Sequence, residues 1–453
     1  MGIDFALDFI LGTATAAYQV EGAVAESGRG ASIWDSFSHT LGKTLNGDTG
    51  DIACDQFHRL EEDLDIMAEL GVDAYRFSIA WPRIQPTGAG TPNQTGLDFY
   101  SRLVDGLLAR GIQPWATLYH WDLPQTLQDK GGWPSRETAY RFGDYAEIMA
   151  NSLGDRVAAW MTLNEPWCAA MLGHASGIHA PGVTSPGAAV AAAHHLLLGH
   201  GLGAQALRAG VTGRVGIALN VHQFYPGGDG DDDLEACRVA DATANRLYCD
   251  PLLLGRYDQA TLEALKPVTD WRFVRDGDLD LIHQELVFVG LNYYAPSYVR
   301  AGSVRMSEPT CWVGAEMVEW LPPRPPLTQM GNSIEPQGLT DLLVDFHARY
   351  DGVDLIISEN GASMPDVVSA DGQVHDQDRI DYLDAHLRAV AEARELGVPV
   401  IGYLVWSLMD NFEWACGYSQ RFGLIRVDYP TQVRTWKDSA RWFQQFCSTR
   451  TLP

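Results

Sequence analysis

The sequence contains no long uninterrupted hydrophobic run. No segment reaches the ~18 consecutive apolar residues that a membrane-spanning helix needs, and the fairly apolar stretch from Phe5 to Ala17 is broken by Asp8. Asp4 precedes this stretch and no basic residue does, so it does not fit a secretory signal peptide. We therefore expect a cytoplasmic protein that does not bind membranes.

Positive charge is scarce as well. Lys and Arg number 32 against 58 Asp and Glu, which gives a formal net charge of −26. A surface of this sign repels phosphate backbones and anionic lipids, so we expect no nucleic-acid partner. The 14 tryptophans favour a neutral ligand such as a sugar, because indole faces suit its apolar faces, although cores also use tryptophan.

Motifs for metals and dinucleotides are missing. The seven cysteines are odd in number and scattered without CxxC spacing, which is typical of reduced thiols rather than of a disulfide framework or zinc site. His194 and His195 are adjacent on a helical stretch and point to different faces, and no HExxH motif occurs. We expect neither a metal nor an organic cofactor.

Short apolar runs alternate with longer segments of helical period. The runs are nearly continuous in apolar residues, as expected for parallel strands covered on both faces. Two amphipathic segments end in Gly71 and Gly111, the residue expected just after a helix. The eight runs comprise residues 9–14, 74–79, 114–119, 159–164, 215–220, 287–292, 355–359 and 400–407.

Eight strands alternating with helices predict a (β/α)₈ TIM barrel, which runs from ~200 to more than ~400 residues as one domain. The composition shows no shift that would mark a boundary, so we predict one domain over residues 1–453. A doubly wound open sheet is the alternative fold. Its GxGxxG fingerprint is absent, since Gly12 is followed directly by Thr13 and Ala14.

Polar residues crowd the carboxyl ends of the predicted strands. In a barrel these ends converge on one mouth, where such folds place their active sites. His120 is ambiguous, because a capping or core histidine would look the same. The residues at or just after the strand ends are Gln19, Arg76, His120, Trp121, Asn164, Glu165, Asn292, Tyr294, Glu359, Asn360 and Trp406.

Two carboxylates stand out at these ends. Either Glu165 or Glu359 alone would most often be a solvated loop residue, but on opposite sides of one mouth they form a plausible acid/base and nucleophile pair about 5–5.5 Å apart. Arg76 beside Glu359 would hold that carboxylate ionised, and Tyr294 could donate a hydrogen bond to it. In a dry pocket near that charge, Glu165 would keep its proton.

Four motifs occur in order along the chain. They are FILGTATAAYQVEG at Phe9–Gly22, TLNEP at Thr162–Pro166, ISENG at Ile357–Gly361 and SLMDNFEW at Ser407–Trp414, which continues to Leu424. With these motifs the chain resembles the family 1 glycoside hydrolases of the β-glucosidase type over essentially its whole length.

The resemblance implies that Glu165 is the acid/base and Glu359 the nucleophile, with Arg76 and Tyr294 holding the latter. Asn164 would bond the 2-hydroxyl of the sugar, a contact that strengthens in the transition state. The further sugar-binding residues that it implies are Gln19, His120, Trp121, Asn292, Trp406, Glu413 and Trp414, together with Phe422.

Relatives that cleave 6-phospho sugars replace the Glu-Trp pair, whereas Glu413 here would repel a phosphate. Thioglucosidases replace the acid/base with Gln, whereas this chain keeps Glu165.

Two departures from the family concern Leu11, where Trp is usual, and Asn332, which stands where a Trp usually stacks on the leaving group. Trp312 or Trp320 could substitute for that platform.

The sequence thus predicts a retaining exo-β-glucosidase that also accepts β-galactosides or β-fucosides and acts on β-glycosides or short oligosaccharides, as in cellulose degradation. A catalytically inactive barrel that binds glycans or a protein is the alternative, which the presence of both Glu165 and Glu359 disfavours. A barrel aldolase or isomerase would need a Schiff-base lysine or a metal cluster, and none of the eight strand ends carries a lysine.

Overall fold

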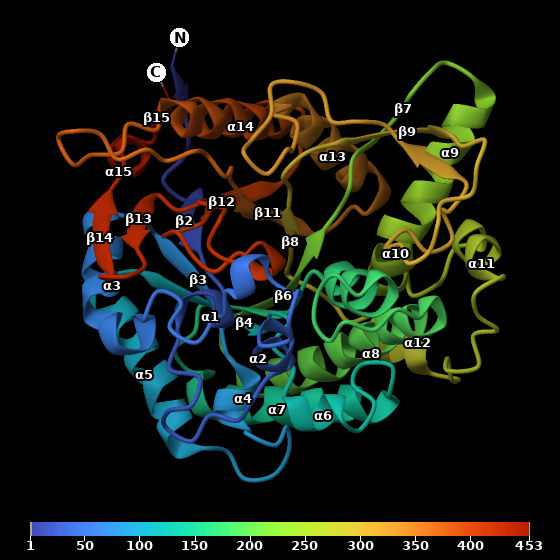
Figure 1. The fold of residues 1–453 in the computed structure, drawn as a ribbon, viewed down its shortest axis with the longest axis horizontal. Helices are drawn as coiled ribbons and strands as arrows, with labels where there is room; N and C mark the ends of the chain where they lie inside the picture. Colours follow the sequence, from blue (N-terminus) through green and yellow to red (C-terminus); the bar gives the residue numbers. More distant parts are fainter. Residues whose placement is uncertain (1, 453) are drawn as a thin grey trace.

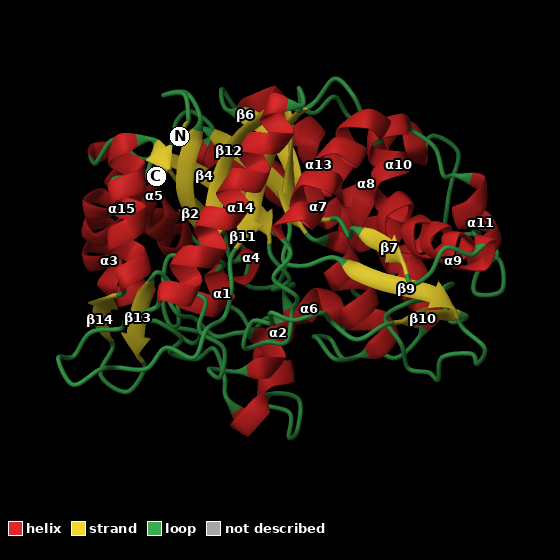
Figure 2. Cartoon of the chain, turned by 90° about the horizontal axis from the view of Figure 1, so that it is seen from above, coloured by secondary structure: helices red, strands yellow, loops and turns green. Residues whose placement is uncertain are grey.

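The computed structural model describes residues 2–452. Eight parallel strands close into a barrel in the order β11-β12-β2-β3-β4-β5-β6-β8, and Figure 2 shows this barrel surrounded by helices. The (β/α)₈ fold predicted from the sequence is confirmed. The barrel strands are β2 (Ile10–Ala14), β3 (Ala74–Ser78), β4 (Gln113–Tyr119), β5 (Ala159–Asn164), β6 (Arg214–Asn220), β8 (Phe288–Asn292), β11 (Asp354–Asn360) and β12 (Val400–Trp406).

Each predicted apolar run forms one of these strands, because its side chains are buried on both faces of the sheet. The apolar N-terminal stretch supplies β2, whose five residues are all buried. Leu11, one of the two family departures, is buried there. The glycine expected after the first amphipathic segment is also in place, since Gly71 ends α3 with a φ of 71°.

Helices cover the outside of the barrel (Figure 1). None of the helices formed by residues 2–452 combines the length and apolarity that crossing a membrane requires. The longer helices are α3 (Gln56–Leu70), α5 (Gln94–Ala109), α7 (Arg136–Leu153), α8 (Pro186–Gly210), α9 (Asp231–Asp241), α10 (Leu247–Leu254), α13 (Pro336–Arg349), α14 (Gln377–Glu395) and α15 (Asp438–Thr449). The shorter ones are α1 (Ala17–Val20), α2 (Ile33–Ser38), α4 (Trp81–Ile84), α6 (Gln125–Gln128), α11 (Gln259–Leu265) and α12 (Asp278–Ile282).

In the described part of the chain, three small sheets lie outside the barrel, and the sequence patterns did not predict them. Their strands are short, so period-2 patterning gives little signal. The chain termini lie side by side in Figure 1 because the first and last strands pair. The sheets are β1 (Ile3–Asp4) with β15 (Thr451–Leu452), β7 (Phe224–Pro226) with β9 (Ser297–Ala301) and β10 (Val318–Trp320), and β13 (Ile425–Asp428) with β14 (Val433–Trp436).

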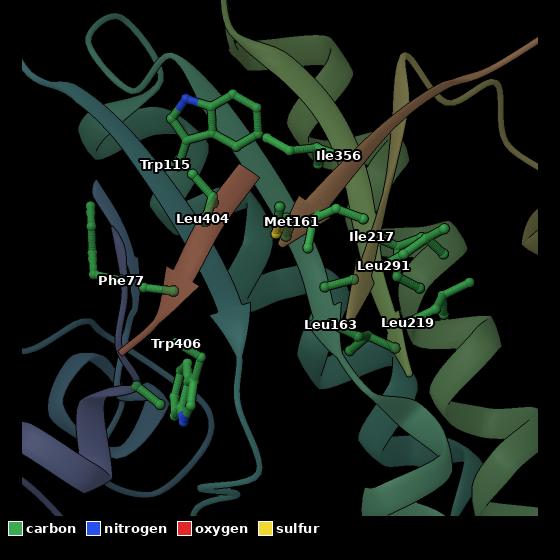
Figure 3. Close-up of a cluster of buried hydrophobic side chains, with 14 of the residues drawn as sticks. Phe77, Trp115, Met161, Leu163, Ile217, Leu219, Leu291, Ile356, Leu404 and Trp406 are labelled. Atoms are coloured by element: carbon green, nitrogen blue, oxygen red, sulfur yellow. The ribbon is translucent and has the colours of Figure 1, made fainter. Parts of the chain in front are cut away.

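The buried core follows the barrel strands. Figure 3 shows Met161, Leu163 and Leu291 among the hydrophobic side chains packed there, with Trp406 at a strand end, and all of them are buried. Packing of this density fixes the strand ends relative to one another. The side chains that emerge beyond those ends are therefore held on a rigid frame.

Candidate active site

The carboxyl ends of the barrel strands meet around a cavity of about 240 Å³. Both singled-out carboxylates, Glu165 and Glu359, line it. The expected convergence of these two carboxylates on one mouth is therefore seen in the structure, whereas Asn360 bonds Tyr293 and Tyr382 and does not line the cavity. The other lining residues are His120, Trp121, His179, Tyr294, Met330, Asn332, Trp406, Glu413, Trp414, Ala415, Cys416 and Phe422.

Local irregularities in the backbone aim both carboxyl groups. The pairing of β11 with β8 shifts register between Ile357 and Glu359, and that of β5 with β6 shifts between Met161 and Asn164. Such bulges redirect side chains next to active sites. Glu165 itself has a φ of 46°, a left-handed conformation that costs about 1–3 kcal/mol and persists only where its surroundings impose it.

Glu359 is held by a cation and a hydroxyl. Arg76, which is fully buried, places its guanidinium 2.6 Å from Glu359 Oε1, and the Tyr294 hydroxyl donates to Oε2 at 2.8 Å. The same guanidinium donates to Asn164 Oδ1 at 2.6 Å. The contacts of Arg76 and Tyr294 with Glu359 favour its ionised form. They therefore act against the rise in pKa that burial causes for this carboxyl group.

No cation within residues 2–452 forms an ion pair with Glu165. Asn292 Nδ2 donates to Glu165 Oε1 at 2.6 Å, and the Cys168 thiol donates to Oε2 at 3.1 Å. Asn292 is positioned in turn by Ser358, whose hydroxyl donates to Asn292 Oδ1 at 2.6 Å. Each oxygen of the Glu165 carboxyl group therefore has a protein partner.

The two carboxyl groups differ in where their proton resides. Burial, reinforced by the charge of Glu359, raises the pKa of Glu165 to about 7. Burial also raises the pKa of Glu359, but the adjacent Arg76 cation and the Tyr294 hydroxyl act against this. The shared proton of such a pair therefore belongs on Glu165, with Glu359 ionised.

A pH profile follows from this assignment. Below pH 7 the Glu165 carboxyl group is protonated and can donate, and above pH 7 it loses the proton. We expect kcat/KM for a substrate with a poor leaving group to fall about tenfold per pH unit above an apparent pKa near 7. A profile that stays flat to about pH 9 would contradict Glu165 as the proton donor, and Glu165→Ala should lack this limb.

Cys168 gives a second testable consequence. Its thiol donates to the carboxylate of Glu165 and so favours ionisation. We expect Cys168→Val to raise the apparent pKa of the basic limb by about half a pH unit, since a hydrogen bond to the charged form is lost. Cys168→Ser, which keeps a donor, should leave the limb nearly in place, whereas equal shifts for both variants would refute this role.

Polar side chains surround the remainder of the cavity. Glu413 accepts hydrogen bonds from Gln19 Nε2 at 3.3 Å and from Asn411 Nδ2 at 3.2 Å. Gln19 Oε1 is buried without a partner in the protein, so it is available to a ligand hydroxyl. Burial raises the pKa of Glu413 to about 8, with the charge of Glu359 as a further cause.

Aromatic rings form one wall. The Trp414 ring lies 4.6 Å from that of Trp121, and the His120 ring stacks on Trp406 at 6.0 Å. Asn164 Nδ2 donates to His120 Nε2 at 3.0 Å, so the ambiguous histidine belongs to the site. Phe422 packs edge-on to Tyr294 at 6.1 Å.

The leaving-group side differs from what the sequence suggested. Met330 and Asn332 line the cavity, whereas neither Trp312 nor Trp320 is among its lining residues. These two rings stack on each other at 4.4 Å, and Trp312 packs against Trp167 at 5.1 Å. They therefore do not line the cavity beside Asn332, and one face of each ring is covered by the other ring.

Several contributors were missed by sequence reasoning. Ser358 carried a signal, as a hydroxyl inside an apolar run, but its partner Asn292 lies on another strand. Cys168 follows Glu165 by three residues, and the contact exists because the π-helical segment η2 (Cys168–Ser176) begins there. His179 lies on a loop and gave no signal. Among residues 2–452, no cluster of three or more His, Cys, Asp or Glu side chains could hold a metal ion.

A closed parallel barrel with two buried acids in its mouth, one paired with arginine and one that keeps its proton, defines a glycoside hydrolase that works with two carboxyl groups. The model of glycosyl hydrolase family 1 matches residues 1–452, and the chain belongs to this family.

Relatives of known function are similar over nearly the whole chain. A bifunctional β-D-glucosidase/β-D-fucosidase of Bifidobacterium breve is 51% identical, with 98% of each chain covered. β-Glucosidase A of Thermotoga maritima is 45% identical, again with 98% of each chain covered. A solved structure of the family 1 β-glucosidase from Thermotoga maritima superposes with a TM-score of 0.95 at 44% identity, covering 99% of each chain.

Proposed function

We propose that this glycoside hydrolase is a retaining, exo-acting β-glucosidase that also accepts β-fucosides and β-galactosides, with residues 1–453 as one catalytic domain. The observation that carries the proposal is the unequal environment of the two acids, since Arg76 contacts Glu359 and only neutral donors contact Glu165. Relatives named for glucosidase and fucosidase activity support the choice of substrates.

The reaction takes two displacements. The ionised Glu359 attacks the anomeric carbon, while the protonated Glu165 donates to the departing glycosidic oxygen. Glu165 then removes a proton from water, which attacks the same carbon, releases Glu359 and returns the starting states. Two inversions leave the configuration of the sugar unchanged.

The polar wall and the aromatic wall would hold the sugar. Glu413 and Gln19 can bond hydroxyl groups on one edge, with the indole of Trp406 against an apolar face. Asn164 is bound to Arg76 and is thereby placed to bond the 2-hydroxyl. We assign further sugar contacts to His120, Trp121, Asn292, Trp414 and Phe422.

The decisive experiment is the hydrolysis of an aryl β-glucoside followed by ¹H NMR. We expect β-glucose to appear first and α-glucose only later, by mutarotation. Initial release of α-glucose would refute the double displacement. A kinetic panel of aryl β-glucosides, β-fucosides, β-galactosides and cello-oligosaccharides then measures substrate preference, and no turnover of any of them would favour an inactive glycan-binding barrel.

We also propose that the enzyme works in the cytoplasm on short β-glycosides such as those from cellulose. All seven cysteine side chains are free thiols, the state that a reducing compartment maintains. Localisation by fractionation with a cytoplasmic marker protein would test this, and recovery with secreted proteins would contradict it.

A further inference from the structure

A second cavity lies outside the barrel mouth and takes no part in the proposed reaction. It measures about 210 Å³, close to the 240 Å³ of the catalytic cavity. Its lining residues come from the helical segment that runs from α9 to α10, from α13, and from the stretch between the end of β6 and the first residue of β7. A ligand of monosaccharide size that fits one cavity therefore has room in the other.

The lining of the second cavity combines aromatic rings with polar side chains that can form hydrogen bonds. Phe224 and Phe346 supply aromatic surface, and Gln223 and Asp345 present an amide and a carboxylate. Gln223 is buried, and its Nε2 reaches Asp345 Oδ2 only at 3.5 Å. The amide can therefore exchange this long contact for a ligand hydroxyl.

Both arginines that line this second cavity have a carboxylate partner. Arg349 pairs with Asp241 at 2.7 Å, and Arg238 pairs with Glu235 at 2.6 Å. The Asp345 carboxylate, which accepts the long amide contact of 3.5 Å, adds negative charge and can accept hydrogen bonds from hydroxyl groups. The lining thus disfavours an anion and suits a neutral ligand with hydroxyl groups on its edges and an apolar face.

A chain of contacts links the second cavity to Trp167, which lies in the segment that follows the acid/base Glu165. The π-helical segment η3 (Ala242–Arg246), a feature that is frequent at functional sites, places Asn245. Asn245 Nδ2 donates to the His222 carbonyl at 2.8 Å, and the His222 amide donates to Asn245 Oδ1 at 2.9 Å. The His222 ring then packs edge-on against Trp167 at 5.0 Å, two residues beyond Glu165.

From these contacts we propose that the second cavity binds a small neutral polyhydroxylated molecule of the monosaccharide class and transmits its occupancy through His222 and Trp167 to the loop of Glu165. Binding of the ligand in the second cavity does not depend on the proposed function. The effect of that binding on Glu165 does rest on the proposed function. A ligand that orders His222 changes the packing of His222 against Trp167, which lies two residues beyond Glu165.

Hydrogen–deuterium exchange with D-glucose as the probe tests the binding. In the wild-type protein we expect D-glucose to slow exchange in residues 221–224 and 237–249. Gln223→Leu should abolish this protection while kcat/KM measured without added glucose stays within about twofold. Asp345→Asn, which keeps a hydrogen-bonding side chain, should retain it. Glu413→Ala should weaken protection around the catalytic cavity and leave the second cavity protected.

Three results would overturn the binding site: no protection of these segments in the wild-type protein, protection that persists in Gln223→Leu, or protection by inorganic phosphate instead of D-glucose. The transmission is read from kinetics. D-glucose should change kcat of the wild-type enzyme beyond competitive inhibition and leave only competitive inhibition in Gln223→Leu, and identical glucose dependence in both would refute it. Exchange is measured independently of turnover, so failure of the proposed function would be recognised separately.

Discussion

Glu359→Gln is expected to lower kcat for an aryl β-glucoside by on the order of 10⁵-fold, which corresponds to about 7 kcal/mol of lost transition-state stabilisation. The amide is nearly isosteric but cannot attack the anomeric carbon or form the covalent intermediate. The measurement is the initial rate of phenolate release by purified, folded protein.

The control for this variant comes from a matched ion pair. Glu21 is buried and pairs with Arg83 at 2.9 Å, as Glu359 pairs with Arg76, but it does not line the catalytic cavity. Glu21→Gln also leaves an arginine unpaired and should lower the free energy of unfolding by a few kcal/mol, with turnover per folded molecule largely kept. Comparable loss of turnover in both variants would mean that Glu359 acts only through stability.

Glu165→Ala is expected to impair substrates in proportion to the basicity of their leaving group. Alkyl glucosides and cellobiose need a proton on the departing oxygen, so their kcat/KM should fall by about 10²–10⁴-fold. A dinitrophenyl glucoside leaves without this proton, so its first step should change little. The checking measurement is kcat/KM across a series of aryl glucosides of graded phenol pKa.

Azide provides the control for Glu165→Ala. The truncated side chain leaves room for the small anion, which attacks the covalent intermediate without a general base and should give β-glucosyl azide. This rescue should be absent in the wild-type enzyme, where Glu165 occupies the space. An equal loss for every leaving group, without azide product, would exclude Glu165 as the proton donor.

Much of the site could be located in advance because it depends on local patterns. Continuous apolar runs specify buried parallel strands, and the polar residues that follow them lie at one end of the barrel whatever the details of packing. Glu165, Glu359 and Arg76 could be singled out in this way. The roles of individual sugar-binding residues came from the motifs, since their spacing says nothing about which hydroxyl each would bond.

The leaving-group side shows where such reasoning fails. Trp312 and Trp320 were candidates for a platform because they lie near Asn332 in the sequence, but they stack on each other. Nearness along the chain does not indicate which face of a ring stays free. Which ring face stays free depends on the pairing of β10 with β9, which places Trp320, and on the contact between Trp167 and Trp312.

The barrel, its eight strands and the two acids at their ends could be predicted from the amino-acid sequence, because apolar periodicity is a property of a few neighbouring residues. The residue pattern also predicted an ionised Glu359 and a protonated Glu165, but most of the contacts that set these states can be seen only in the folded protein. Arg76 from β3 reaches Glu359 on β11, and the Cys168 thiol and Asn292 from β8 reach Glu165. These contacts exist only after the barrel has closed, since closure brings the ends of strands that are far apart in the chain close together.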